Sequence, residues 1–146
     1  MTLFDTTTLS AAGTEGAGPV ADAVQSRANI FKMTQAAEDA VLRPEDCGAF
    51  PHDLRAAIAA RIAAHAGEPG LAGRYAPSAN ARADISDPAQ GVGPDHAALI
   101  AFVDKAAGAT KDIAAADIAR LQSAGISDAD VVRLCELVAF VSYQVR

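Results

Sequence analysis

The stretch that determines the fold class is PHDLRAAIAARIAAHAG, residues 51–67. Pro51 suits the first position of a helix, because proline lacks the N–H that would be unpaired there. Gly67 follows as a C-terminal stop, since glycine readily takes the left-handed conformation that ends many helices. Between them the large apolar side chains recur at four-residue steps, as on one face of an α-helix: Leu54, Ile58 and Ile62. We therefore predict a helix that starts at Pro51 and ends before Gly67.

The same spacing recurs along most of the chain. Hydrophobic residues make up 51% of the sequence but aromatic residues only 5%, so much of the apolar content is alanine, the best helix former. No sustained alternation of apolar and polar residues indicates a strand. The fold class predicted is all-α, a compact single-domain bundle of about six to seven helices. The other helices are expected from residue 19 onward, over 29–42 (where Ile30, Met33, Ala37 and Val41 recur at helical spacing), from 71 onward, and over 95–107, 114–124 and 127–146.

The length of 146 residues fits one domain. Residues 1–18 are rich in threonine, serine, alanine and glycine and have little to bury, so we expect a flexible N-terminal segment followed by a helical domain over 19–146. Residues 77–94 contain three prolines and two glycines and form the longest connection. Loops of this length inside a compact domain are often functional or disordered.

The last predicted helix has the best local signature. Ser127 followed by Asp130 resembles a capping box, in which the hydroxyl accepts from a free backbone N–H. From residue 131 to 141 apolar residues cover most of the circumference, so the helix should be buried, in its own core or against another subunit. Cys135 lies in this run and is expected to be a small buried hydrophobe. We therefore expect a homo-oligomer.

The charge of the chain excludes two classes of partner. The formal net charge is −6, and no cluster of lysine or arginine offsets it, so we expect no nucleic-acid partner and no anionic membrane surface. No apolar stretch approaches the ~20 residues that span a bilayer. The first residues, MTLFDTTT, have neither a basic leader nor a hydrophobic segment of signal-peptide length. These features predict a cytoplasmic protein.

Neither the cysteines nor the histidines form a metal-binding pattern. Cys47 and Cys135 are far apart in the sequence and make no Cys-x-x-Cys pair and no zinc-ligand spacing. Carboxylates precede Cys47 at positions 45 and 46, which makes its thiol a poorer nucleophile. His52 and His96 each stand beside a single aspartate, and adjacent residues point to different faces of a helix. We expect no metal and no cofactor.

Two stretches resemble the alkylhydroperoxidase D and carboxymuconolactone decarboxylase family. The first is residues 52–75, an alanine-rich helix that ends in glycine. The second is residues 124–146, in which AGISDADVV leads into a helix that ends in AFVSYQVR. A Gly-hydrophobic-Ser-Asp start followed by an aromatic-hydrophobic-polar-Tyr end is typical of that family's all-helical domains. The resemblance implies the family's fold and an ancestry among antioxidant peroxidases.

The peroxidase members of that family carry a Cys-x-x-Cys-x-x-x-His motif directly after the helix, with a glutamate twelve residues before the first cysteine. One thiolate attacks the peroxide, the second forms a disulfide with it, and the histidine and glutamate transfer protons. When Gly67 is aligned with the family's glycine, Glu68 and Leu71 replace the cysteines, Tyr75 replaces the histidine and Ala56 replaces the glutamate. The resemblance therefore implies a divergent protein without dithiol peroxidase activity.

If a pocket persists at the family's site, the residues nearest to it are His65, Glu68, Arg74 and Tyr75. His65 and Glu68 are three residues apart across the helix end, close enough to form a proton-transfer pair. Ordinary structural roles are also open for three of them: Glu68 as a charge at a helix start, Arg74 as a solvated cation and Tyr75 as a packed aromatic. Two functions stay open. One is an enzyme like the decarboxylase branch, using acid–base residues other than thiols on a lactone or similar small acid; the other is a non-catalytic helical oligomer that binds a small ligand or a protein partner.

Overall fold

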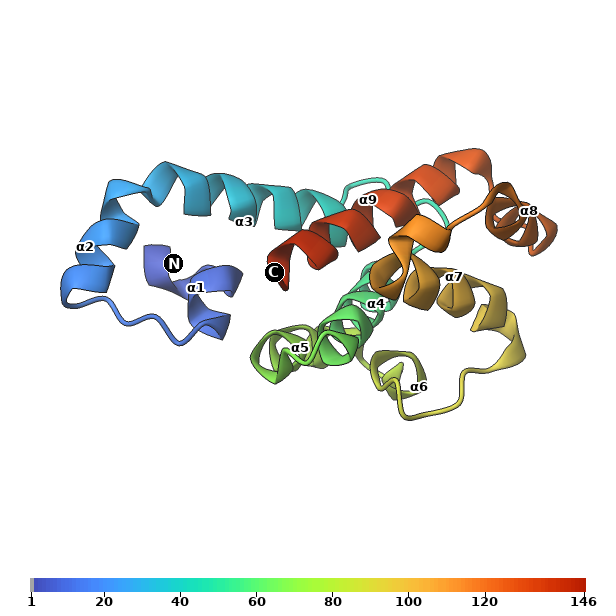
Figure 1. Cartoon of the computed structure of the whole chain (residues 1–146), viewed down its shortest axis with the longest axis horizontal. Helices are drawn as coiled ribbons and strands as arrows, with labels where there is room; N and C mark the ends of the chain where they lie inside the picture. The colour runs from blue at the N-terminus through green and yellow to red at the C-terminus, as the bar shows by residue number, and fades with distance from the viewer. Residues whose placement is uncertain (1) are drawn as a thin grey trace.

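The computed structural model describes residues 2–146, and in this part of the chain the regular secondary structure is all helical, without a strand (Figure 1). The all-α prediction is confirmed. The α-helices are α1 (Thr7–Ala11), α2 (Pro19–Ser26), α3 (Ala28–Leu42), α4 (His52–His65), α5 (Pro69–Tyr75), α6 (Ala83–Ser86), α7 (Ala97–Gly108), α8 (Ala115–Ser123) and α9 (Asp128–Gln144). Four short 3-10 helices join them: η1 (Leu3–Asp5), η2 (Ala76–Ala79), η3 (Pro94–His96) and η4 (Thr110–Asp112).

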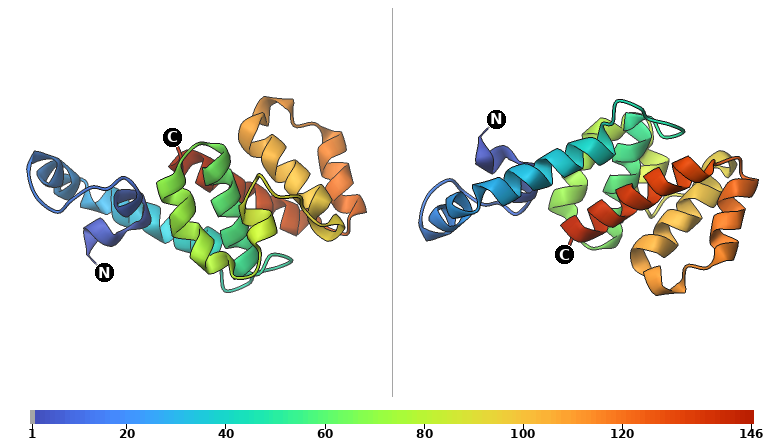
Figure 2. Two further views of the ribbon diagram at one scale, coloured as in Figure 1. Left: turned by 90° about the horizontal axis from the view of Figure 1, so that it is seen from below. Right: turned by 90° about the horizontal axis from the view of Figure 1, so that it is seen from above.

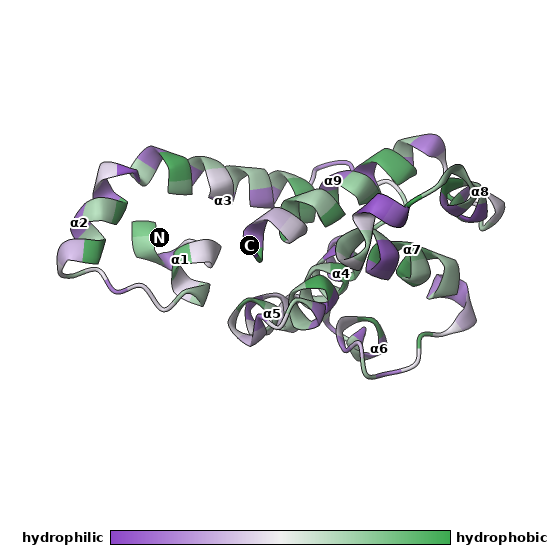
Figure 3. Ribbon diagram, viewed as in Figure 1, coloured by the Kyte–Doolittle hydropathy of each residue, from purple (hydrophilic) through white to green (hydrophobic). Residues whose placement is uncertain are grey.

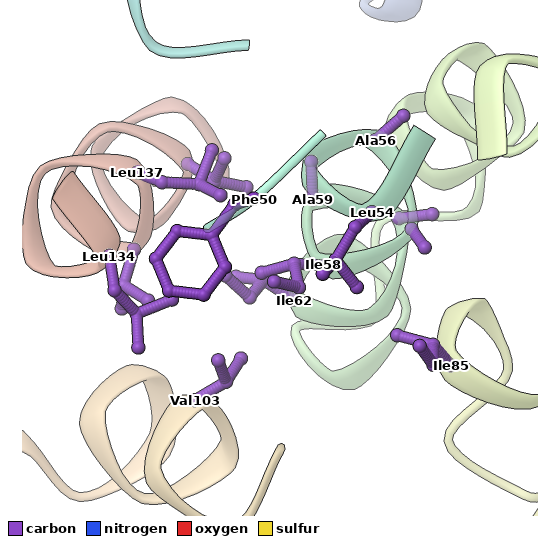
Figure 4. Close-up of a cluster of buried hydrophobic side chains, with 14 of the residues drawn as sticks. Phe50, Leu54, Ala56, Ile58, Ala59, Ile62, Ile85, Val103, Leu134 and Leu137 are labelled. Atoms are coloured by element: carbon purple, nitrogen blue, oxygen red, sulfur yellow. The ribbon is translucent and has the colours of Figure 1, made fainter. Parts of the chain in front are cut away.

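Helix α4 lies at the centre of the molecule and packs against α5, α6, α7 and α9 (Figure 2). Every residue from 54 to 63 is buried. Alanine occupies half of these positions, and its small side chain lets the neighbouring helices approach closely on every side. Isoleucine and leucine fill the remaining space, and Ile58 packs with Phe50, Val103, Leu134 and Leu137 in the main core (Figure 4). Helix α7 also contributes to the core, because its Leu99, Ile100 and Val103 side chains are buried.

Two arginines of α4 are buried, and each has its donors satisfied. Arg55 donates to three backbone carbonyls in the loop before the helix and at the end of α3, those of Phe50 (2.7 Å), Val41 (2.7 Å) and Cys47 (2.9 Å). Arg61 forms a two-pronged ion pair with Asp104 of α7, at 2.7 and 2.9 Å. Because a buried charge without partners costs several kcal/mol, these contacts fix how the flanking segments sit on α4.

Helices α3 and α9 run antiparallel and lie side by side, while α2 and the first half of α3 extend away from the body of the molecule (Figures 1 and 2). The predicted bounds of α3 are confirmed to within one residue. The apolar residues that indicated this helix do not form its buried side, however: Ile30 is 47% exposed and Met33 66% exposed. The buried side carries Glu38 and Leu42 instead.

Helix α9 begins as predicted, with the Asp130 amide donating to the Ser127 hydroxyl at 3.2 Å. The prediction that Cys135 is buried is wrong, because its side of α9 faces solvent. Val132 and Tyr143 lie on the same outer side and are 57% and 64% exposed. Only part of the apolar circumference of α9 is therefore buried within one chain, at Val131, Leu134, Leu137, Val138 and Val141.

The predicted flexible N-terminal segment and the longest predicted connection, 77–94, both contain short helices. Near the N-terminus, Thr6, Thr7 and Leu9 are buried, where the sequence indicated little to bury. Within residues 77–94, α6 buries Ile85 against α4. None of the helices described here is both long enough and apolar enough to cross a bilayer.

Candidate functional site

The four residues proposed from the sequence lie in three different places. Arg74 and Tyr75 line a cavity next to α3. His65 lies in a second cavity, at the C-terminal ends of α4, α7 and α9, with its Nε2 atom 3.3 Å from Asp104 Oδ1. Glu68 is exposed at the start of α5. The sequence suggested that His65 pairs with Glu68, whereas in the structure its partner is Asp104.

The first cavity has a volume of about 390 Å³ and lies between α1, α3, α4 and α5. We call it the Glu38 cavity, after the carboxylate in its wall. Its other walls come from Thr7, His52, Ala56, Arg74 and Tyr75. Proline at the first position of α5 sets the start of that short helix, and its last residue, Tyr75, then turns towards α3.

The Glu38 side chain is almost completely buried, with the residue only 2% exposed. Its Oε1 atom accepts from the Thr7 hydroxyl at 2.6 Å and from Gln35 Nε2 at 3.3 Å. Its Oε2 atom accepts from Gln144 Nε2 at 2.7 Å and from the Tyr75 hydroxyl at 3.2 Å. The four donors come from four different helices, so α1, α3, α5 and α9 all meet at this carboxylate.

All four donors are neutral. Within residues 2–146, no lysine, arginine or histidine nitrogen lies within 4.0 Å of the Glu38 carboxylate. Buried carboxylates are usually paired with a cation, because desolvation of an unpaired ion costs several kcal/mol. A carboxylate that is held by neutral groups next to open space can exchange a proton with a bound molecule. Glu38 is therefore the strongest candidate for an acid–base group in this structure.

Tyr75 is the neutral partner of this carboxylate. Burial, and after it the negative charge of Glu38, raise the pKa of Tyr75 well above its ordinary value of about 10. Its hydroxyl therefore keeps its hydrogen at physiological pH and lies within reach of two acceptors, Glu38 Oε2 and Gln144 Oε1. The site thus places a carboxylate and a protonated phenol side by side.

Two exposed arginines, Arg43 and Arg74, line the rim of the cavity together with His52 and Asp5. Arg43 is half exposed and pairs with Asp39 one turn earlier in α3. Arg74 makes one long contact, from Nη2 to the backbone oxygen of Asp5 at 3.4 Å. His52 uses Nε2 to contact the Pro44 carbonyl at 2.9 Å, which leaves Nδ1 without a protein partner in the hydrogen bonds of the described chain. Guanidinium groups bind carboxylates well, so this rim suits a small molecule with an acidic group.

The second cavity, of about 340 Å³, is a weaker candidate. Asp104 there is already held by Arg61, and its pairing with His65 completes a network that connects α4 to α7. Three helices present their C-terminal ends to it, and the negative ends of helix dipoles disfavour the charge that develops on oxygen in most acyl-transfer reactions. The buried Ser142 hydroxyl nearby has no hydrogen-bond partner. We find no chemistry that these groups would favour together.

Metal binding is not indicated at either cavity. Among the residues that the structure describes, no three or more histidine, cysteine, aspartate or glutamate side chains cluster in a way that could hold a metal ion. Both cysteines are free, Cys47 in the loop after α3 and Cys135 on the outer side of α9.

Sequence reasoning missed Glu38. It stands in Thr34-Gln35-Ala36-Ala37-Glu38-Asp39, a run that looks like the solvated side of a helix. Its spacing could have indicated burial. Glu38 lies three residues after Gln35 and four residues before Leu42, so it shares one side of the helix with a buried leucine. Its partners Tyr75 and Gln144 are distant in sequence, and no local pattern links them to it.

Comparison of the chain with family models, with curated proteins and with solved structures finds no match.

Alkaline pH should destabilise the fold through Tyr75. A tyrosine in the unfolded chain ionises at about pH 10, whereas the raised pKa keeps the folded Tyr75 neutral, so its contribution is intact below pH 10 and is lost as the pH rises above it. Urea unfolding at about pH 8 and about pH 11 measures this, with Tyr75→Phe as the comparison. The wild type should lose more stability between the two pH values than Tyr75→Phe does; equal losses would contradict the assignment.

Proposed function

We propose that this chain is a divergent relative of the alkylhydroperoxidase D and carboxymuconolactone decarboxylase proteins that has no dithiol peroxidase activity. In its place, the Glu38 cavity binds a small carboxylic acid, and Glu38 transfers a proton to and from it. The observation that carries this proposal is the buried Glu38 carboxylate, held by four neutral donors at the wall of a cavity with arginines at its rim.

The position of the cavity supports the resemblance. Ala56 and Tyr75, the residues aligned with the family's glutamate and histidine, both line the Glu38 cavity although they belong to different helices. A carboxylate is also present there, contributed by α3 rather than by α4. On this proposal the family's site has kept its place and its acid–base character while losing its sulfur chemistry.

The proposed reaction is a proton transfer without any change in oxidation state. Arg43 and Arg74 bind the carboxylate of the ligand at the rim, which directs the rest of the molecule towards Glu38. Glu38 takes a proton from a carbon next to a carbonyl group, and the Tyr75 hydroxyl donates a hydrogen bond to the oxygen on which charge develops. Return of the proton from Glu38 to another carbon of the same molecule completes an isomerisation, with no bond other than the two C–H bonds broken or formed at the enzyme.

Thiol-dependent peroxide reduction should be absent. Cys47 and Cys135 lie on different elements and neither lines the Glu38 cavity, so no second thiol is placed to resolve a sulfenic acid. Consumption of hydrogen peroxide and of cumene hydroperoxide in the presence of dithiothreitol should match that of a Cys47→Ser, Cys135→Ser double variant. Turnover by the wild type that Cys47→Ser abolishes would overturn this part of the proposal.

Binding and proton transfer can be separated with one probe, 5-oxotetrahydrofuran-2-carboxylate, a small lactone acid. Calorimetry should show saturable binding to the wild type, weakened about five-fold in Arg74→Gln, since an exposed charge pair contributes about 1 kcal/mol. Glu38→Gln should still bind but exchange the carbon-bound hydrogens of the probe for deuterium about 10²-fold more slowly, because the general base is gone.

Arg120→Gln, on the exposed side of α8, is the matched control and should behave as the wild type in both assays. Deuterium exchange at the wild-type rate in Glu38→Gln would exclude Glu38 as the base. Equal binding by the wild type and Arg74→Gln would exclude the proposed rim.

A second part of the proposal is that the chain forms homo-oligomers through the outer side of α3 and α9, here called the α3–α9 face. It carries the exposed side chains of Ile30, Met33, Val132 and Tyr143, and the apolar colouring along both helices is visible in Figure 3. A groove of about 370 Å³ runs between the two helices, where Ala37 and Phe140 also lie. Contiguous apolar surface of this kind marks an interface, and pairing about a two-fold axis would cover the face of both copies at once.

Sedimentation velocity should therefore show a dimer or larger assembly at micromolar concentration. Met33→Asp and Tyr143→Asp should each weaken the association about ten-fold or more, because burying a charge in an apolar interface is unfavourable. Ala119→Asp places the same charge on the exposed side of α8 and should leave the assembly unchanged. A wild-type monomer at these concentrations would rule out the interface.

A further inference from the structure

Residues 2–12 lie across the Glu38 cavity. This segment contains η1 and α1 and passes between α3 and α5 (Figure 1). Asp5 and Thr7 contribute directly to the cavity wall. Behind them lie the Glu38 carboxylate and the Tyr75 hydroxyl, and both residues are buried. The segment and the rim arginines therefore both contribute to the outer part of the cavity wall.

Polar contacts hold the segment in place. The Thr7 amide donates to Gln35 Oε1 at 2.8 Å, and the Thr7 hydroxyl donates to Glu38 at 2.6 Å. Gln144 Nε2 donates to the Thr8 hydroxyl at 3.2 Å. Hydrogen bonds of this kind exchange for bonds to water when a segment opens, so the neutral ones contribute little net stability and the bond to the Glu38 carboxylate contributes the most. The same contacts are lost together if the segment moves away.

The apolar attachment of residues 2–12 is small. Leu9 is their only buried hydrophobic side chain, and it does not belong to the main core around α4. Ala11 is partly buried and touches α5. Its carbonyl oxygen lies close to Gly70, because a Cβ atom added to Gly70 would be only 3.0 Å from that oxygen. Segments with few buried apolar contacts belong to the least stable part of a fold and open without global unfolding.

The connection that follows has the freedom that a hinge requires. Gly13 and Gly18 both adopt positive φ angles, +64° and +83°, which glycine reaches at little cost. Residues 13–18 between them are largely exposed, and within residues 15–18 no amide donates a backbone hydrogen bond of the kind seen in turns. A rotation within this stretch would move residues 2–12 as a unit.

We propose that residues 2–12 form a lid that opens about the Gly13–Gly18 hinge and exposes Glu38 and Tyr75 to solvent and to an entering small molecule. The lid depends on the contacts above and not on the identity of the ligand or on the proposed proton transfer, so it can be tested without either. Thr7 is the latch, because its amide and its hydroxyl contact two different side chains of α3.

Nitration of tyrosine by tetranitromethane, followed by peptide mass spectrometry, measures the opening. The chain has two tyrosines, and exposed Tyr143 provides the internal reference for buried Tyr75. Thr7→Val keeps the shape of the side chain but removes the bond to Glu38, and it should raise the nitration rate of Tyr75 relative to Tyr143 about ten-fold or more, the change expected for the loss of one hydrogen bond to a charged group. Thr110→Val removes a comparable hydroxyl contact on η4 and should leave the ratio unchanged. An unchanged ratio in a folded Thr7→Val variant would overturn the proposal.

Hydrogen exchange in the wild type gives a test that needs no variant to fold. The amides of Ser10 and Ala12, which bond within the lid, should exchange at least about 100-fold faster than amides in the middle of α4, and their exchange should depend only weakly on low concentrations of urea, because lid opening exposes little surface. Exchange at the rate and urea dependence of α4 would show that residues 2–12 leave only when the whole chain unfolds, and would also overturn the proposal.

Discussion

Ten consecutive buried residues in α4 are the constraint on which the rest of the structure depends. A helix covered on all sides cannot carry side chains of ordinary size all round, because the neighbouring helices would be held apart and leave voids. Alanine at half of the positions solves this and brings α5, α6, α7 and α9 into contact with one axis. The large core side chains come from α4 itself and from the helices that meet it (Figure 4).

Glu38 is the second feature that organises the molecule, and its energetics differ from those of the core. Hydrogen bonds to a charged group contribute about 1.5–3 kcal/mol each, which is comparable in sum to the several kcal/mol that it costs to desolvate the ion. Apolar side chains in place of Glu38 and its donors together would pack at least as well, so stability alone gives no reason for a carboxylate here. The same side chain brings together α1, α3, α5 and α9, so the geometry of the cavity and the attachment of the N-terminal segment depend on one group.

Local patterns in the sequence were sufficient to predict where the helices begin and end, but not which side of each helix is buried. The bounds of α3 and α4 follow from apolar spacing and from proline and glycine at the ends, because these are properties of neighbouring residues. The apolar residues of α3 indicated the helix correctly but not its buried side, since both sides carry apolar residues and only tertiary packing decides which one is covered. Cys135 was misplaced for the same reason. For the candidate site, Tyr75 and Arg74 could be named from an alignment, whereas Glu38 could not, because its partners lie on other helices.

The buried Arg55 has a consequence for how this sequence can change over evolutionary time. Its guanidinium group reaches three carbonyls that point in different directions, two of them in the loop between α3 and α4 and the third in the last turn of α3. A lysine ammonium has a single nitrogen on a flexible stem and cannot span the same three oxygens, so this usually conservative exchange would leave carbonyls bare in the interior. Arg55 contacts only backbone atoms of the loop, so substitutions of the exposed loop side chains do not affect these contacts. Position 55 itself cannot change in this way. An arginine at this position should therefore be kept in descendants of this sequence whose loop follows the same backbone path.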